Sequence, residues 1–273
     1  MAKITFTSIK TINDAIKYVK QFLNDYSLDI DGLKDFPFKN LESDSEYGCP
    51  DRSFDYDDTN LARAIYFIIW KDLPEMDISE IGTGKKYRGD TLNTFNTMFS
   101  ADLSRCDILS GGNKELCDKA EVFRDICYSL GNFSVLPNIS IPLSKNKETT
   151  INLYRGNWNG WKDFYDTFLR ELNLCLPESN NANEVLAELV KANSFYFLQI
   201  DSISKFKDIN FLSPYFTEGD TIKELFKHDF YGWKLDSKAY IGFANFYIDK
   251  ATEIIKYRAD VIIQKLNEYF NKV

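Results

Sequence analysis

The chain has 273 residues, of which 44% are apolar and 15% aromatic, and this is enough to bury a sizeable core. Lys and Arg number 33 against 41 Asp and Glu, and the net charge of -8 makes a nucleic-acid partner unfavourable. Residues 1–20 lack the apolar core of a secretory signal, so a cytoplasmic location is expected. The longest apolar run, Ala64 to Trp70, is too short to span a membrane.

The number and spacing of the cysteines and histidines limit the kinds of site that the chain can form. Five cysteines occur without any C-x-x-C spacing, which indicates reduced, mostly buried thiols rather than a disulfide framework or a zinc ribbon. His228 is the single histidine, so triads and metal sites that need several histidines are disfavoured.

The first periodic segment is Thr11 to Tyr26, where apolar residues recur at spacings of three and four and predict an amphipathic helix. Residues 27–58 are rich in Asp, Ser, Gly and Pro, and they predict a long irregular segment pinned by Phe36, Phe38 and Tyr47.

Two further helices are predicted in the next third of the chain. The first covers Leu61 to Leu73, is apolar on more than one face, and is stopped by Pro74. The second covers Lys114 to Leu130 and is ended by Gly131.

The apolar period then changes toward that of strands. Asn132 to Ile141 and Thr149 to Tyr154 predict a hairpin joined by the polar turn Ser144 to Glu148. Ser194 to Ile200 also favours a strand.

Helical spacing returns at Trp161 to Leu174 and at Asn183 to Ala192. The longest predicted element is Ser237 to Phe270, a helix of about 50 Å at 1.5 Å per residue. The fold class expected is therefore α+β, predominantly α-helical, with a small antiparallel hairpin or sheet and a long C-terminal helix. We expect one domain over 1–273, in which a subregion 1–54 packs on a main body 55–273.

Asp55, Asp57 and Thr59 form the D-x-D-x-T spacing of phosphatases that resemble haloacid dehalogenases. Residues 49–54 do not form the buried strand that such a loop follows, so a helix start is favoured, capped by Asp58 or Thr59 with the other acids supported by the helix dipole. A second alternative is a divalent-metal site on Asp55, Asp57 and Asp58, because hard oxygen ligands suit Mg²⁺.

Residues 150–161 carry the best candidate for ligand binding. An arginine can pair with an anion and two tryptophans can stack on a planar group, so the stretch suggests a binding surface. The favoured interpretation is structural, with the arginine paired to Asp163 or Asp166. The residues expected to line any pocket are Asn152, Arg155, Trp158 and Trp161.

Short motifs follow one another from Asp55 to the C-terminal helix. They are DTNL from Asp58, WKDLP from Trp70, FSAD from Phe99, GNF from Gly131, PN from Pro137, IN from Ile151, RG from Arg155, and the stretch Phe195 to Asp201. In this order they resemble an uncharacterised bacterial family known only as a domain of unknown function. The chain departs from the family's pattern in its aromatic segment before Asp55 and in its shortage of histidine. The resemblance implies a bacterial or phage-borne cytosolic protein and transfers no catalytic residue.

These observations favour a non-enzymatic binding or interaction protein without a cofactor, whose partner is a protein or a small ligand. The alternative is a metal-dependent enzyme acting on a nucleotide or phosphorylated substrate, with Mg²⁺ on Asp55, Asp57 and Asp58 and the phosphate on Arg155. The two hypotheses differ in whether those carboxylates meet Arg155 in one concave pocket. A third hypothesis is a subunit of a larger assembly that offers the helix Ser237 to Phe270 as a contact surface.

Overall fold

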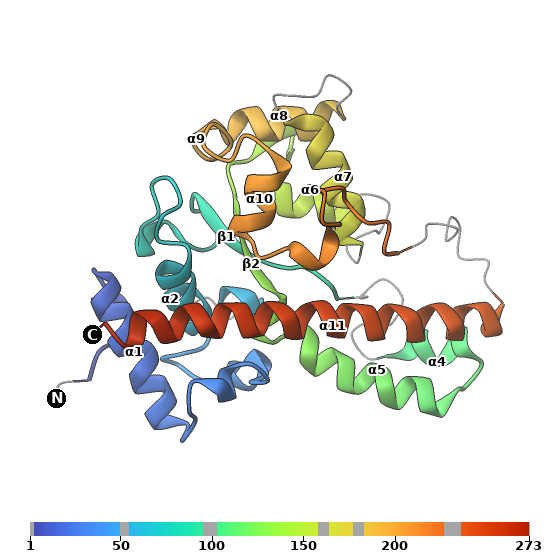
Figure 1. The fold of residues 1–273 in the computed structure, drawn as a ribbon, viewed down its shortest axis with the longest axis horizontal. Helices are drawn as coiled ribbons and strands as arrows, with labels where there is room; N and C mark the ends of the chain where they lie inside the picture. Colours follow the sequence, from blue (N-terminus) through green and yellow to red (C-terminus); the bar gives the residue numbers. More distant parts are fainter. Residues whose placement is uncertain are drawn as a thin grey trace.

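The computed structural model describes residues 3–49, 55–94, 103–157, 164–176, 183–226 and 236–272. The protein is an α+β, mostly helical fold with two small antiparallel sheets and a long C-terminal helix, as the sequence predicts (Figure 1). The α-helices are α1 Ile12–Asp25, α2 Asn60–Ile69, α4 Ser104–Ser110, α5 Lys114–Cys127, α6 Ile151–Asn157, α7 Tyr165–Cys175, α8 Glu184–Ala192, α9 Ser194–Phe197, α10 Ile203–Ile209 and α11 Ser237–Phe270. Short 3₁₀ helices are η1 Phe6–Ser8, η2 Asp31–Leu33, η3 Phe38–Leu41, η4 Tyr56–Asp58, η5 Ile78–Glu80, η6 Leu130–Asn132 and η7 Ser213–Tyr215.

Helix α1 begins where the sequence predicts it to begin. Thr11 accepts a hydrogen bond from the backbone N–H of Asp14, whose carboxylate accepts in turn from the N–H of Thr11. The predicted apolar face is buried and packs against α2.

The irregular segment predicted after α1 is confirmed over residues 27–49 and 55–58, where it contains η2, η3 and η4. Phe36, Phe38 and Tyr47 are all buried, and the ring of Phe22 meets those of Phe36 and Tyr47 edge to face. These aromatic contacts attach the segment to α1.

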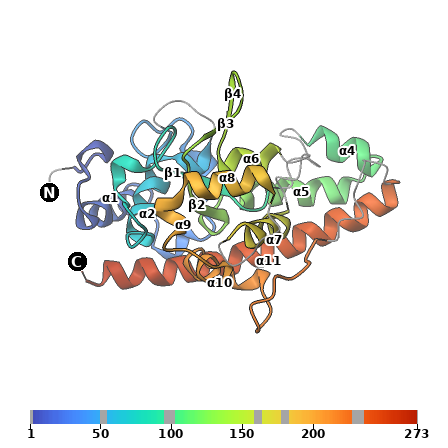
Figure 2. The same ribbon diagram turned by 90° about the horizontal axis from the view of Figure 1, so that it is seen from above.

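The two sheets differ from the predicted hairpin. β1 (Tyr87–Thr91) pairs antiparallel with β2 (Phe133–Pro137), and β3 (Ile141–Ser144) pairs antiparallel with β4 (Lys147–Thr149). The β3–β4 hairpin projects from the body of the molecule (Figure 2). A hairpin therefore forms around the predicted turn, but the run of residues predicted as its first strand is divided between two sheets.

The second predicted strand is wrong after Thr149, because the chain there enters helix α6. Ile151, Tyr154 and Arg155 are buried at helical spacing, whereas Leu153 is 39% exposed. The apolar alternation of Ile151 and Leu153 therefore does not reflect burial. The strand predicted for Ser194 to Ile200 is also wrong, since Ser194–Phe197 form α9 and the next three residues form a turn and a bend.

Helix α11 has the predicted bounds, Ser237 to Phe270, and is capped by the carboxylate of Asp236, which accepts from the N–H of Ala239. It runs along the whole molecule, from the side where both chain termini lie to a projecting end (Figure 1). At that end α4 and α5 pack against its N-terminal half. We call the group formed by α4, α5 and this half of α11 the helical arm.

Arg258 links α11 to the β1–β2 sheet and its surroundings through hydrogen bonds. Its side chain is fully buried and donates hydrogen bonds to the carbonyl oxygens of Gly131, Phe133 and Asn210. A Cβ on Gly131 would lie 2.0 Å from the carbonyl oxygen of Ile255, so this close approach requires glycine. The 3₁₀ helix η6 and strand β2 are thus hydrogen-bonded to α11 at this point.

The buried apolar residues form one cluster that extends along the chain from Ile9 to Leu266. It includes residues of α1 as well as of α11, so the N-terminal subregion shares the core of the main body. No helix within the described ranges combines the length and the apolar character that crossing a bilayer demands.

Candidate functional site

Acidic and basic side chains converge around β1 from four parts of the chain. We call this group the β1 charge cluster. It consists of Asp55, Asp57 and Asp58 at η4, Arg63 on α2, Arg88 and Asp90 on β1, and Asn152 and Arg155 on α6.

The centre of the cluster is the buried pair of Asp90 and Arg155. Arg155 donates from Nε to Asp90 Oδ2 at 2.8 Å and from a terminal nitrogen to Asp90 Oδ1 at 2.5 Å. The same nitrogen donates to the carbonyl oxygen of Thr91 at 2.6 Å, and Asn152 Nδ2 donates to Asp90 Oδ1 at 2.6 Å. Two of the predicted binding residues therefore meet, and both hold a carboxylate of the protein itself.

Of the two predicted partners of Arg155, Asp166 has other partners in the structure. Asp166 accepts instead from Arg170 and from the backbone N–H groups of Leu225 and Phe226. Asp163 lies outside the described residues, as do Trp158, Trp161 and His228. Arg155 finds Asp90 because α6 carries its side chain to β1.

Asp58 and Asp55 also face arginines. Asp58 is 1% exposed and receives two hydrogen bonds from Arg63, from Nε at 3.0 Å and from a terminal nitrogen at 2.9 Å, plus one from Thr83 Oγ1 at 3.1 Å. Asp55, which is more exposed, is paired with Arg88. Bidentate geometry makes the Arg63 pair the tighter of the two.

The helix-cap prediction is right for Thr59 and wrong for its acidic neighbours. Thr59 Oγ1 accepts from the backbone N–H of Ala62 at 3.2 Å and so caps α2. The carboxylates of Asp55, Asp57 and Asp58 are directed to arginine and threonine side chains instead of to the amides of that helix.

Asp57 is the carboxylate of the cluster with no guanidinium partner among the described residues. It is 8% exposed, and its Oδ2 accepts from Thr91 Oγ1 at 3.2 Å. Burial, followed by the charges of Asp55, Asp90 and Asp58, raises the pKa of Asp57 to about 7. The cluster thus holds one carboxyl group that exchanges a proton near neutral pH.

Glycine at position 89 allows η4 to lie against β1. A Cβ there would be 2.1 Å from the carbonyl oxygen of Asp57, which also accepts a hydrogen bond from the hydroxyl of Tyr66 at 2.7 Å. The residues on either side of Gly89 each form an ion pair: Arg88 with Asp55, and Asp90 with Arg155.

The metal-site interpretation of Asp55, Asp57 and Asp58 does not fit this arrangement. Their oxygens diverge toward Arg88, Thr91 and Arg63 and do not surround a common point. Within the ranges that the structure describes, no three His, Cys, Asp or Glu side chains are grouped so that they could hold a metal ion. The phosphatase interpretation also fails, because Asp55 leads into η4 and both described sheets are antiparallel.

Aromatic side chains close the cluster on the side of α7. The guanidinium carbon of Arg155 lies 5.4 Å from the centre of the Tyr165 ring, and Tyr215 donates from its hydroxyl to Asn93 Oδ1 at 2.8 Å. The hydroxyl of Tyr165 and the Nδ2 of Asn93 are buried and have no hydrogen-bond partner among the described residues. Such groups in protein interiors commonly bind ordered water.

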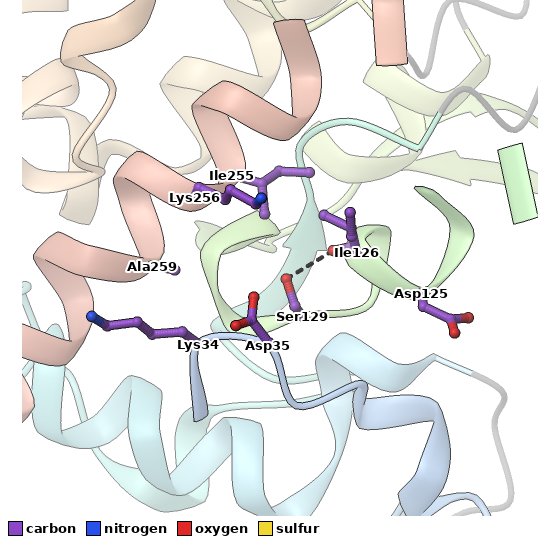
Figure 3. Close-up of a pocket in the computed structure, with 8 residues that line it drawn as sticks. All are labelled: Lys34, Asp35, Asp125, Ile126, Ser129, Ile255, Lys256 and Ala259. Atoms are coloured by element: carbon purple, nitrogen blue, oxygen red, sulfur yellow. Dashed lines mark hydrogen bonds between the residues drawn. The ribbon is translucent and has the colours of Figure 1, made fainter. Parts of the chain in front are cut away.

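A small pocket of about 70 Å³, partly open to solvent, lies where η2, the end of α5 and α11 meet (Figure 3). Its lining residues are Lys34, Asp35, Asp125, Ile126, Ser129, Ile255, Lys256 and Ala259. Lys34 is already paired with Asp31 and Asp260, and the Ser129 hydroxyl donates to the carbonyl oxygen of Ile126. None of the lining residues belongs to the β1 charge cluster.

Sequence reasoning missed Arg63, Arg88 and Asp90 as members of the cluster. Arg88 and Asp90 carry no local signal, because nothing in the surrounding sequence indicates that β1 lies between η4 and α6. Comparison with family models, curated proteins and solved structures finds no match for this chain. The fold and the cluster thus define the protein as an α+β, mostly helical protein with a buried charge cluster.

Proposed function

We propose that the protein is a non-catalytic binding protein that acts through contacts with another protein. The observation that supports this proposal is the pairing of charged side chains within the β1 charge cluster. Asp90, Asp58 and Asp55 each engage an arginine of the same chain, so the groups that a phosphate or metal chemistry would need are bound to one another.

The energetics of burial support a structural role for these pairs. Asp90 and Arg155 are 1% and 7% exposed, and releasing either partner to a substrate would leave the other as an uncompensated buried charge. Breaking a buried pair in this way costs about 3–5 kcal/mol. A substrate phosphate would have to offset that cost before any chemistry began.

The helical arm offers the surface for a partner. Each of its three helices exposes an apolar side chain: Ile108 on α4 is 75% exposed, Val122 on α5 is 63% exposed and Phe246 on α11 is 44% exposed. The arm projects from the body at the end far from both termini, and this position suits contact with a partner (Figure 1). A protein surface that presents apolar side chains would bury these residues.

Site-specific photo-crosslinking in the native host tests this proposal. A photoreactive amino acid at Ile108 is expected to give a discrete protein adduct that a second substitution on the arm, Val122→Asp, abolishes. The matched control is the same amino acid at Leu198, which is 77% exposed but lies next to α9, away from the arm. Adducts of equal yield at Leu198, or none at Ile108, would contradict the proposal.

The buried environment of Asp57 favours the alternative, an enzyme acting on a nucleotide or phosphorylated substrate. A buried carboxyl group with a pKa of about 7 is suited to proton transfer. Thermal unfolding with Mg²⁺, Mn²⁺ and nucleotides separates the two hypotheses, because a ligand at 100 times its dissociation constant adds about 2.7 kcal/mol. The binding-protein proposal predicts no shift; a shift that Asp57→Asn removes and Asp72→Asn keeps would favour the enzyme.

A further inference from the structure

Two cysteines that are separate in the sequence meet in the helical arm. Cys106 on α4 and Cys117 on α5 place their sulfur atoms 3.6 Å apart. Gly111 and Gly112, both at positive φ, end α4 and reverse the chain, and Asn113 then caps α5 by accepting from the N–H of Leu116. The tight turn between the two helices is what brings the thiols together (Figures 1 and 2).

The two thiols differ in their access to solvent. Cys106 is fully buried, whereas Cys117 is partly exposed. Burial raises the pKa of Cys106 to about 12, although a hydrogen bond with Tyr240 of α11 opposes this shift. Because Cys117 is the more accessible of the two thiols, an oxidant in solution meets Cys117 first.

We propose that Cys106 and Cys117 are a redox modification site that forms a reversible disulfide within the helical arm. The pair needs only a small movement, since the sulfur atoms must approach by about 1.5 Å to reach bonding distance. The oxidant class is a low-molecular-weight disulfide, and the reductant that restores the pair is a dithiol.

The exchange proceeds in two balanced steps. The Cys117 thiolate attacks one sulfur of the small disulfide, forming a mixed disulfide and releasing one small thiolate. Cys106 then loses its proton to water and attacks the Cys117 sulfur, which releases the second small thiolate. Two electrons pass from the cysteine pair to the small disulfide, and the two released thiolates take up the two protons.

The remaining cysteines provide internal controls. Among the described contacts, the thiols of Cys49, Cys127 and Cys175 donate to the backbone carbonyl oxygens of Asp55, Thr94 and Asn183. Burial raises the pKa of the partly exposed Cys175 to about 11, so it resembles Cys106 in its low reactivity. Oxidation is therefore expected to be confined to one pair.

The test treats the full chain with oxidised glutathione at neutral pH and counts thiols before and after. We expect the loss of two of the five thiols, a peptide map that joins the segments containing Cys106 and Cys117, and full recovery with dithiothreitol. Cys117→Ser should lose no thiol pair, and Cys175→Ser should behave like the wild type. Because Cys117 is partly exposed, its replacement by serine leaves the folded chain intact, which circular dichroism checks.

A second probe reads the reduced state directly. Phenylarsine oxide bridges two neighbouring thiols, so it should label the reduced protein at this pair and fail to label the oxidised protein or Cys117→Ser. Retention of all five thiols after oxidation, a stable glutathione adduct at Cys117, or a disulfide joining other cysteines or two chains would each overturn the proposal.

Discussion

Arg155 holds Asp90 through both carboxylate oxygens, and this pair joins helix α6 to strand β1 in the interior of the protein. Sixty-five positions separate the two residues in the chain. The pair replaces the role that the sequence suggests for Arg155, the binding of an anion, because the anion that this arginine holds is a carboxylate of the protein itself. Its burial explains why the arginine is not free to bind a ligand.

The protonation of Asp57 makes stability depend on pH. Its pKa in the folded state is about 7, against an ordinary 3.8, so the folded state holds this proton more tightly than the unfolded chain. The stabilisation that results is fully present below about pH 4 and is lost as the pH rises toward 7. Asp57→Asn removes this titration and should raise the free energy of unfolding above pH 7 by about 1–3 kcal/mol.

Urea denaturation across pH 5 to 8 measures the effect of Asp57→Asn. The matched control is Asp72→Asn, whose side chain is 84% exposed and which should follow the wild type at every pH. An unchanged pH slope in Asp57→Asn would show that Asp57 is ionised throughout.

Gly89 is expected to tolerate no side chain. Gly89→Ala places a methyl group 2.1 Å from the Asp57 carbonyl oxygen, and since that atom is backbone, η4 or β1 must move. We expect a loss of about 2 kcal/mol or more. Gly242→Ala in α11 meets no atom within 4 Å and should stabilise the protein by about 0.5–1 kcal/mol, as measured by the thermal midpoint of each variant.

Thr59 is expected to contribute a helix cap. Thr59→Ala removes the acceptor for the Ala62 N–H and should cost about 1 kcal/mol, whereas Thr59→Ser should keep most of the stability. Equal stability of the alanine and serine variants in denaturant titrations would exclude the cap.

The elements that could be predicted from the sequence are those marked by a long periodic pattern or by a motif of neighbouring residues. The α11 stripe repeats over many turns and Thr11 forms a capping box, so both helices could be placed from residue spacing alone. Helix α6 is short, with few apolar residues, and its period could not be separated from that of a strand.

The charge cluster could not be predicted because its contacts are long-range. β1 pairs with β2 and receives side chains from η4 and α6, and none of these neighbours is adjacent to it in the chain. Asn152 and Arg155 were identified as a site because an arginine that can bind an anion stands beside tryptophans that can stack on a planar group, but their partner Asp90 carries no local signal. The same limit applies to Cys106 and Cys117, whose spacing matches no known motif.

The central claim, that the β1 charge cluster holds the fold together, is tested most directly by a double-mutant cycle. Asp90→Asn and Arg155→Met should each cost about 3–5 kcal/mol, and the double variant should cost clearly less than their sum, with a coupling of about 2 kcal/mol. The exposed pair Lys250 and Glu253 is the control, with an expected coupling below about 0.5 kcal/mol. Additive effects at Asp90 and Arg155, with little loss of stability from either variant, would contradict the claim.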